Sequence, residues 1–300
     1  MLKTRVALIA VGICTVVGAV FVLRLQTAER ASQNQTSPSR SGGLNEILEG
    51  LTLSLPTVSS TNNRAALAEG LRRRQDAIEK LRADASGYLP QLMEEVYAVG
   101  HIEATNQNAA ASRTAQLALA FEALGSEARP LLPKLEDEFN AGRSIGPCVA
   151  AFQHIGGTDC GLILVSGLTN SDRLIRNAAM STLSGFATNR DVAIFAVRPL
   201  LQLLKDDSEF SRALAASVLG SLQQEPDAVI PDLLQVANND SNFVVRVSAV
   251  KAIGRFGTNA AVVRTDLESI AARDQERSVR RIAEVAVRAA NGEIRPDEVQ

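Results

Sequence analysis

Histidine and cysteine, the residue types that most often carry out chemistry, are few in this chain and widely spaced. The only histidines are His101 and His154, and neither is followed by the glutamate of a His-Glu metal motif. A zinc or iron site needs several such ligands at short spacing. The sequence therefore predicts no metal site, no cofactor and no catalytic residue.

The two cysteines in the body of the chain, Cys148 and Cys160, lack the spacing of a metal or redox motif, because no Cys-x-x-Cys occurs. Two small buried apolar side chains are expected at these positions. A disulfide between them is the alternative in an oxidising compartment.

The densest local charge is the run Arg72, Arg73 and Arg74. Such a run can bind a phosphate-rich or acidic partner, or the anionic surface of a membrane. It can equally be the solvated face of a first, capping helix in a repeat array. The three arginines are therefore the candidate partner-binding residues, with the solvated face as the alternative.

Four further arginines recur at a nearly fixed interval. Arg176, Arg212, Arg246 and Arg280 are separated by 36, 34 and 34 residues. Around each arginine, positions −1, +3, +4 and +7 form one stripe at helical period, and position +3 is always alanine. An Asp or Asn six residues before each arginine is expected to cap the helix. Self-similarity at this interval indicates an array of helical repeats.

The composition also favours helices. Aromatic residues make up 4% of the chain and tryptophan is absent, whereas a β-sandwich or barrel is rich in aromatic and β-branched residues. Long runs rich in alanine and leucine suit closely packed helices. The expected helices span residues 64–83, 86–99, 109–124, 128–141, 145–155, 159–168, 172–186, 190–205, 209–222, 227–238, 242–256, 260–272 and 276–291.

The repeated pattern is Asp-x5-Arg-x2-Ala-x3-Leu/Ile-Gly, followed by a helix that a Pro-x-Leu sequence is expected to open, as at Pro199 and Pro231. It resembles the HEAT repeat, in the short prokaryotic form found in phycobilin lyases, over about residues 64–290. The resemblance implies a right-handed α-solenoid of HEAT-like helix pairs, with a hydrogen-bonded ladder between adjacent repeats. Cys148 stands where a ladder arginine is expected. The implied ladder residues are Asp206, Arg212, Asp240, Arg246, Asp274 and Arg280.

An apolar run without a charge spans residues 6–23, after Lys3 and Arg5. Its length just reaches that of a membrane-spanning helix, so residues 1–26 are predicted to be a transmembrane anchor. The basic flank favours a cytoplasmic N-terminus, with the rest of the chain extracytoplasmic, or periplasmic in a bacterium. A cleaved signal peptide and a lipoprotein attached through Cys14 are the alternatives.

Three segments follow the anchor. Residues 27–62 are predicted to be a flexible linker, because their first part is rich in Ser, Gln and Asn and ends in Ser-Gly-Gly. The linker ends in a lead-in segment, where Leu44, Ile47, Leu48 and Leu51 form one helical face that can dock on the first repeat. The solenoid is assigned to residues 63–292 and a C-terminal tail to residues 293–300.

The net charge of the chain argues against one class of partner, nucleic acids. The net charge is −2 for the whole chain and −4 without the first 23 residues, so no nucleic-acid partner is expected. The sequence predicts a non-enzymatic scaffold that binds a protein partner of unknown identity and is tethered to a membrane through residues 6–23. The alternative is a HEAT-like lyase-type enzyme, or a chaperone, acting on a tetrapyrrole or protein substrate. The apolar anchor counts against this alternative.

Overall fold

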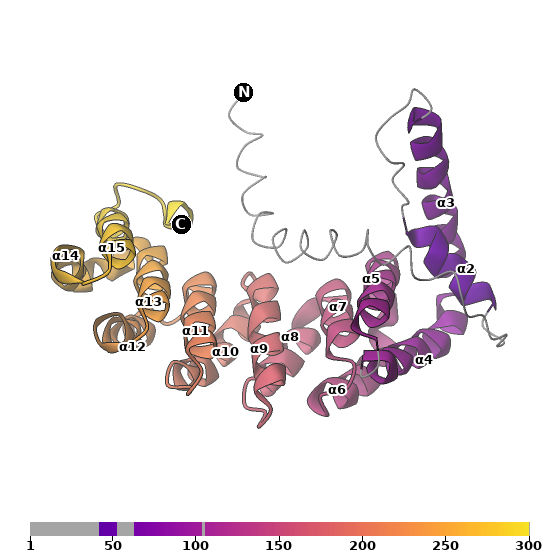
Figure 1. Ribbon diagram of the computed structural model, residues 1–300, viewed down its shortest axis with the longest axis horizontal. Helices are drawn as coiled ribbons and strands as arrows, with labels where there is room; N and C mark the ends of the chain where they lie inside the picture. Colours follow the sequence, from indigo (N-terminus) through magenta and orange to yellow (C-terminus); the bar gives the residue numbers. More distant parts are fainter. Residues whose placement is uncertain (1–41, 53–62, 104–105, 300) are drawn as a thin grey trace. The chain divides into compact units, whose positions relative to one another are not determined.

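The computed structural model describes residues 42–52, 63–103 and 106–299, and every regular element in these ranges is a helix (Figure 1). The predicted all-α class is therefore confirmed. The chain divides into two compact units. The N-terminal unit comprises Met1–Glu138 with Gly146–His154, and the C-terminal unit comprises Phe139–Ile145 with Ile155–Gln300.

None of the helices in the described ranges is both long and apolar enough to span a membrane. The predicted anchor, residues 6–23, lies outside the described residues. Residues 27–41 and 53–62 of the predicted linker also lie outside them. The membrane anchor and most of the linker therefore stay predictions.

The N-terminal unit begins with a short helix, α2, inside the segment assigned to the linker and lead-in. Four apolar residues on one face of α2 are buried, and the helix packs against α3 and α5. Burying a leucine or isoleucine side chain contributes about 1.5–3 kcal/mol, so this face holds α2 on the unit. The buried residues are Leu44, Ile47, Leu48 and Leu51. The helices are α2 (Gly42–Leu51), α3 (Asn63–Ala83), α4 (Ala85–Glu103), α5 (Gln107–Leu124) and η1 (Gly125–Leu131), with most of α6 (Leu132–Asn140) and α7 (Ile145–Ile155).

The C-terminal unit alternates two kinds of helix. Those that carry the regularly spaced arginines, α9, α11, α13 and α15, are called the arginine helices. The others, α8, α10, α12 and α14, each pack against the arginine helix that follows (Figure 1). Its elements are α8 (Gly157–Gly167), α9 (Arg173–Leu183), η2 (Ser184–Phe186), α10 (Arg190–Leu203), α11 (Glu209–Leu222), α12 (Pro226–Asn239), α13 (Phe243–Arg255), η3 (Gly257–Val263), α14 (Arg264–Arg273), α15 (Arg277–Ala290) and η4 (Pro296–Glu298).

Consecutive arginine helices pack directly on one another, and small residues allow the closest approach. A Cβ atom built on Gly220 of α11 would lie 2.6 Å from Ala252 Cα of α13. A Cβ atom on Gly254 of α13 would lie 3.1 Å from Ala286 Cα of α15. Between α11 and α15, the arginine helices pack more closely than the helices between them. This part of the unit therefore curves toward its arginine helices, as stacked repeats in a solenoid do.

Two sequence expectations about helix ends were wrong. Pro199 and Pro231 lie inside α10 and α12 and do not open them. The helix α10 begins after Asn189, whose side chain accepts the Val192 N–H, so this cap sets the start well before the proline. A proline inside a helix removes one backbone hydrogen bond, which the helix tolerates with a local distortion.

Three expected α-helices contain 3-10 turns instead of being regular throughout. The segments predicted at 128–141 and 260–272 begin in η1 and η3, and the one at 172–186 ends in η2. Gly125 and Gly257 open η1 and η3 with positive φ angles of 52° and 56°. Glycine adopts this conformation without a steric penalty, so the chain turns sharply at both positions before it becomes helical again.

Candidate interaction surface

The residues that could carry chemistry do not converge on one site. His154 lies at the end of α7, and His101 lies in the last turn of α4, which continues to Glu103 beyond the expected end at residue 99. Both histidines are exposed. Among the described residues, no group of three or more His, Cys, Asp or Glu side chains could hold a metal ion.

Both cysteines of the described chain are reduced and fully buried. Cys148 and Cys160 have 0% relative exposure and carry thiols. A thiolate nucleophile needs contact with solvent and a nearby positive charge. Both cysteines are therefore small core side chains, as the sequence analysis expected.

The arginine run lies on α3, and each of its members has a carboxylate partner. Arg72 and Arg73 both pair with Glu69, at 2.8 and 3.2 Å, and Arg74 Nη2 lies 3.4 Å from Glu122 Oε2 on α5. Hydrogen bonds from Arg72 and then from Arg73 lower the pKa of Glu69. The positive field of the run is therefore partly neutralised within the N-terminal unit. Partner binding by these three arginines stays a prediction.

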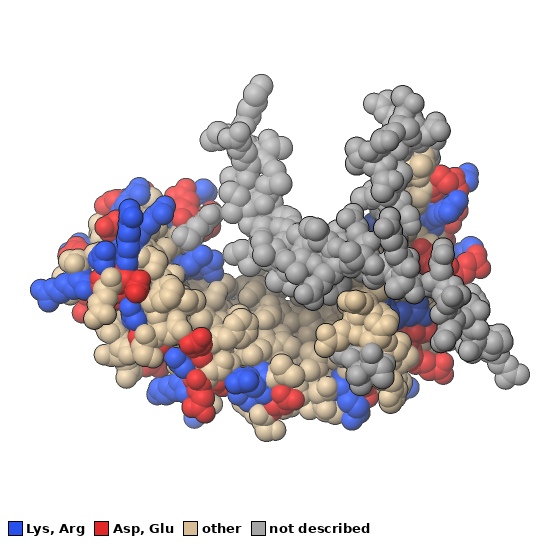
Figure 2. All heavy atoms as spheres, in the orientation of Figure 1, with Lys and Arg blue, Asp and Glu red and all other residues tan. Residues whose placement is uncertain are grey.

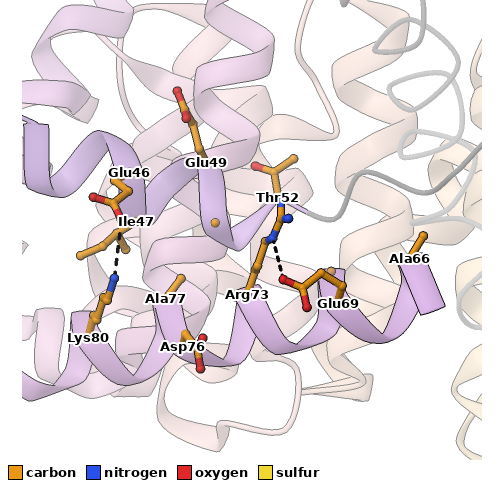
Figure 3. A pocket seen from close by; sticks show the side chains of 12 residues that line it. Glu46, Ile47, Glu49, Thr52, Ala66, Glu69, Arg73, Asp76, Ala77 and Lys80 are labelled. Carbon is orange, nitrogen blue, oxygen red and sulfur yellow. Dashed lines mark hydrogen bonds and ion pairs between the residues drawn. The ribbon is translucent and has the colours of Figure 1, made fainter. Parts of the chain in front are cut away.

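A groove of about 530 Å³ lies between α2 and α3 (Figure 3). Its walls mix both signs of charge, and two ion pairs cross it or line it, Lys80 with Glu46 at 3.6 Å and Arg73 with Glu69 at 3.2 Å. Its described lining contains no histidine or cysteine. The described walls of the groove therefore present no imidazole, no thiol and no single sign of charge to a ligand.

The structure brings the predicted ladder residues of neighbouring repeats together in the C-terminal unit. The Arg212 guanidinium holds the Asp240 carboxylate with two bonds, Nε to Oδ2 at 2.7 Å and Nη2 to Oδ1 at 3.0 Å. Arg246 holds Asp274 in the same way, at 2.9 and 3.0 Å. Bidentate contacts of this kind fix direction as well as distance. Each pair therefore ties one arginine helix to the turn before the next.

Each ladder arginine also binds the turn before its own helix. Arg212 Nη1 donates to the carbonyl oxygens of Asp206 and Asp207, at 2.9 and 3.1 Å. Arg246 Nη1 does the same to Asp240 O and Ser241 O. One guanidinium therefore connects two consecutive turns, which fixes the first turns of successive arginine helices relative to each other.

The two ends of the ladder differ from its middle. Arg176, which the predicted ladder did not include, binds Asp206 Oδ2 at 2.8 Å, although its spacing in the repeat already marked it. Asn170 replaces the aspartate of that first turn, and its side chain accepts the Asp172 N–H at 2.8 Å. At the other end, Arg280 Nη1 donates to Asp274 O and Gln275 O.

The expected capping role of the ladder aspartates was wrong. In α9, α11 and α13 the side chain that caps the helix lies four positions before the arginine, as Ser208 does in α11 and Asn242 in α13. Asp240 instead accepts the backbone N–H of Asn242 at 2.9 Å. This bond closes a turn two residues long, a role common for aspartate. The aspartate therefore orders the turn, and the next polar residue caps the helix.

The ladder makes stability depend on pH. A hydrogen bond from Arg246 is the largest influence on Asp274 and lowers its pKa below the ordinary value of 3.8. For Asp240, burial is the largest influence and raises the pKa, but bonds from Arg212 and Asn242 outweigh it and the net shift is again downward. A carboxyl whose pKa is lower in the folded state stabilises the fold above its unfolded pKa and loses this effect as the pH falls through the folded one.

We therefore expect the free energy of unfolding to fall as the pH drops below about 4, the ordinary range of aspartate. The variant Asp274→Asn cannot ionise at this position, so it should be less stable at pH 7 and lose less stability on acidification. Urea denaturation of the full-length protein between pH 7 and pH 3 measures both effects. An acid-dependent loss equal to that of the wild type would contradict the role of Asp274.

A row of exposed apolar side chains lies two residues before the ladder arginines. Leu174, Phe210 and Val244 have relative exposures of 66%, 61% and 48%. They occupy the same position on α9, α11 and α13, so they are called the apolar row. Sequence reasoning missed this row, although Leu174-Ile175 and Val244-Val245 are adjacent apolar pairs of which only one member can face the core.

Charged side chains of both signs are interspersed over the surface drawn in Figure 2, including the regions of α3 and α15. A nucleic-acid interface usually presents a continuous basic stripe. The described part of this face shows mixed charge instead.

The family model described as HEAT repeats matches residues 197–288. No curated protein matches the chain. The matched segment contains both bidentate ladder pairs of the described residues, Arg212 with Asp240 and Arg246 with Asp274. Together with the all-helical fold, this match supports a HEAT-repeat protein, in which residues 197–288 are the part similar to that family.

Proposed function

We propose that this chain is a non-enzymatic scaffold that binds a protein partner through the arginine helices of its C-terminal unit. HEAT repeats generally mediate protein–protein interactions. The observation that carries the proposal is the apolar row, three large side chains at one position of three successive helices. Single exposed apolar residues are ordinary, whereas an aligned set indicates a contact surface.

The ladder supports this proposal because it fixes the spacing of the row. Arg212 and Arg246 hold the turns before α11, α13 and α15. The row residues lie in the first turns of α9, α11 and α13, next to these turns. A preorganised surface loses less conformational entropy on binding than a mobile one. Part of the ladder's function is therefore to present the row.

We further propose that the scaffold is held at a membrane by residues 6–23, with the repeats on the extracytoplasmic side. The support is the uncharged apolar run of membrane-spanning length and the basic residues Lys3 and Arg5 before it. A tether of this kind restricts the partner to proteins that reach the same membrane surface.

Chemical crosslinking of the full-length chain in its native membranes, followed by affinity capture, tests both parts of the proposal. The chain should stay in the membrane pellet after a carbonate wash and should capture a partner that Phe210→Ser reduces by about tenfold or more, as loss of a central aromatic contact does. The matched control is Phe195→Ser, because Phe195 is also 61% exposed but lies on α10. Release by carbonate would contradict the tether, and equal capture by both variants would contradict the proposed surface.

A further inference from the structure

A pair of half-buried cations lies on α13 without a carboxylate partner among the described residues. Lys251 and Arg255 are one turn apart on this helix, and both are partly buried. Arg255 Nη1 donates to Ser221 Oγ on α11 at 2.9 Å. In the described part of the chain, neither cation pairs with a carboxylate. Burial lowers the pKa of both side chains, and the charge of Arg255 adds to this effect on Lys251.

This arrangement differs from that of the four regularly spaced arginines, because Arg280 binds two backbone carbonyl oxygens and the other three bind carboxylates. Arg176, Arg212 and Arg246 each bind an aspartate of the next turn. Like charges four residues apart destabilise a helix, and burial without a counterion adds to the cost. Helix packing does not require the two charges, because the equivalent positions on α11 are Ser217 and Ser221. The uncompensated pair therefore indicates an anion supplied from outside the unit.

The cation pair and the apolar row lie on one face. Val244, Lys251 and Arg255 are spaced by seven and four residues, which places them on the same side of α13. At 1.5 Å per residue, Lys251 lies about 10 Å along the helix from Val244. The face therefore has apolar contacts at the starts of three helices and a positive charge toward the end of the third.

The helix α11 contributes Leu214 and Ser217, four and seven residues after Phe210, to the same face as the apolar row and the cation pair. Neighbouring helix axes lie about 8–10 Å apart, so the row from Leu174 to Val244 extends over about 20 Å. A helix of about 13 residues has this length. The dimensions fit one amphipathic helix of a partner better than a small molecule.

We infer that this face binds an acidic amphipathic segment of the partner protein. Its apolar side chains pack on Leu174, Phe210 and Val244, and an Asp or Glu carboxylate lies between Lys251 and Arg255. The inference rests on the proposed scaffold function and specifies the chemistry of the partner. A flat bilayer fits the face poorly, because the unit curves toward these helices, whereas a single peptide helix can lie along a curved groove.

Panning a random 16-residue peptide display library on the full-length protein tests the inference. Peptides enriched on the wild type should combine a helical apolar stripe with an excess of Asp and Glu. The double variant Lys251→Ser/Arg255→Ser should bind the selected peptides at least about tenfold more weakly, because bonds between two charged groups are among the strongest polar contacts. The single variant Phe210→Ser should weaken them as well, through the loss of the apolar contact.

The matched control is Arg277→Ser/Arg281→Ser, which removes two exposed arginines of α15 at the same spacing. This control should bind the selected peptides as the wild type does, which separates a local site from the general effect of net charge. Absence of acidic peptides, or equal weakening by both double variants, would overturn the inference. Failure of the panning alone leaves the scaffold proposal in place if Phe210→Ser still reduces capture in native membranes, whereas failure of that capture removes both.

Discussion

The variant Gly220→Ala is expected to lower the free energy of unfolding by about 2–4 kcal/mol. The added methyl group would lie 2.6 Å from Ala252 Cα and 2.8 Å from Ala252 Cβ. The nearest atom is backbone, so no side-chain rotation relieves the clash and α11 must move away from α13. Urea denaturation of the full-length protein, followed by far-UV circular dichroism, measures the change.

The control for this prediction is Gly185→Ala. A Cβ atom at Gly185 meets nothing within 4 Å, and this glycine does not have a positive φ. Alanine restricts the unfolded chain more than glycine, so the control should be neutral or more stable by up to about 1 kcal/mol. If Gly220→Ala behaves like the control, the close contact of α11 with α13 is not required for stability.

The variant Asp240→Ala is expected to lower the free energy of unfolding by about 3 kcal/mol, as removal of one partner of a buried ion pair does. Asp240 accepts two bonds from Arg212 and one from the Asn242 N–H. Its side chain is 8% exposed and that of Arg212 is 17% exposed, so water replaces the lost bonds only in part. The same urea experiment measures the loss.

Asp207→Ala is the matched control, because this neighbouring carboxylate is exposed and the ladder uses only its backbone carbonyl. Its effect should stay within about 0.5 kcal/mol. The double variant Arg212→Ala/Asp240→Ala should lose less than the sum of the single variants, because the two side chains interact directly. Additive losses would show that the pair contributes no coupling energy.

Both predictions concern contacts between adjacent repeats. In an array each repeat is stabilised mainly by its nearest neighbours, so damage at the junction of α11 and α13 should remain local. Hydrogen exchange in α11 and α13 should then increase more than in α9. This local effect separates loss of a junction from general unfolding of the C-terminal unit.

Much of the C-terminal unit could be predicted from the sequence. The interval of 34 to 36 residues and the helical stripe around each arginine placed α9 to α15 close to their observed bounds. These signals are local, because helical period and turn residues depend on near neighbours in the chain. The ends of some helices were less predictable, since η1 and η3 replace the first turns of two expected α-helices and η2 replaces the last turn of a third.

Other features depended on how the helices pack. The sequence pattern indicates that one face is buried, but the angle between neighbouring helices decides how wide that face is. The helical stripe already placed Ile175 in the core, whereas the packing of the helices leaves Leu174 beside it exposed. The apolar row follows from this choice and from the alignment of three helices, which no single helix contains.

By itself, the sequence determined the all-α class, the repeat interval and the residues able to form a ladder. Only the tertiary structure decided that Gly220 meets Ala252, and that no carboxylate of the described residues pairs with the half-buried Lys251 and Arg255. The reason is physical. Period and propensity act over one or two turns, whereas close approach, burial and the pairing of charges depend on residues brought together from different helices.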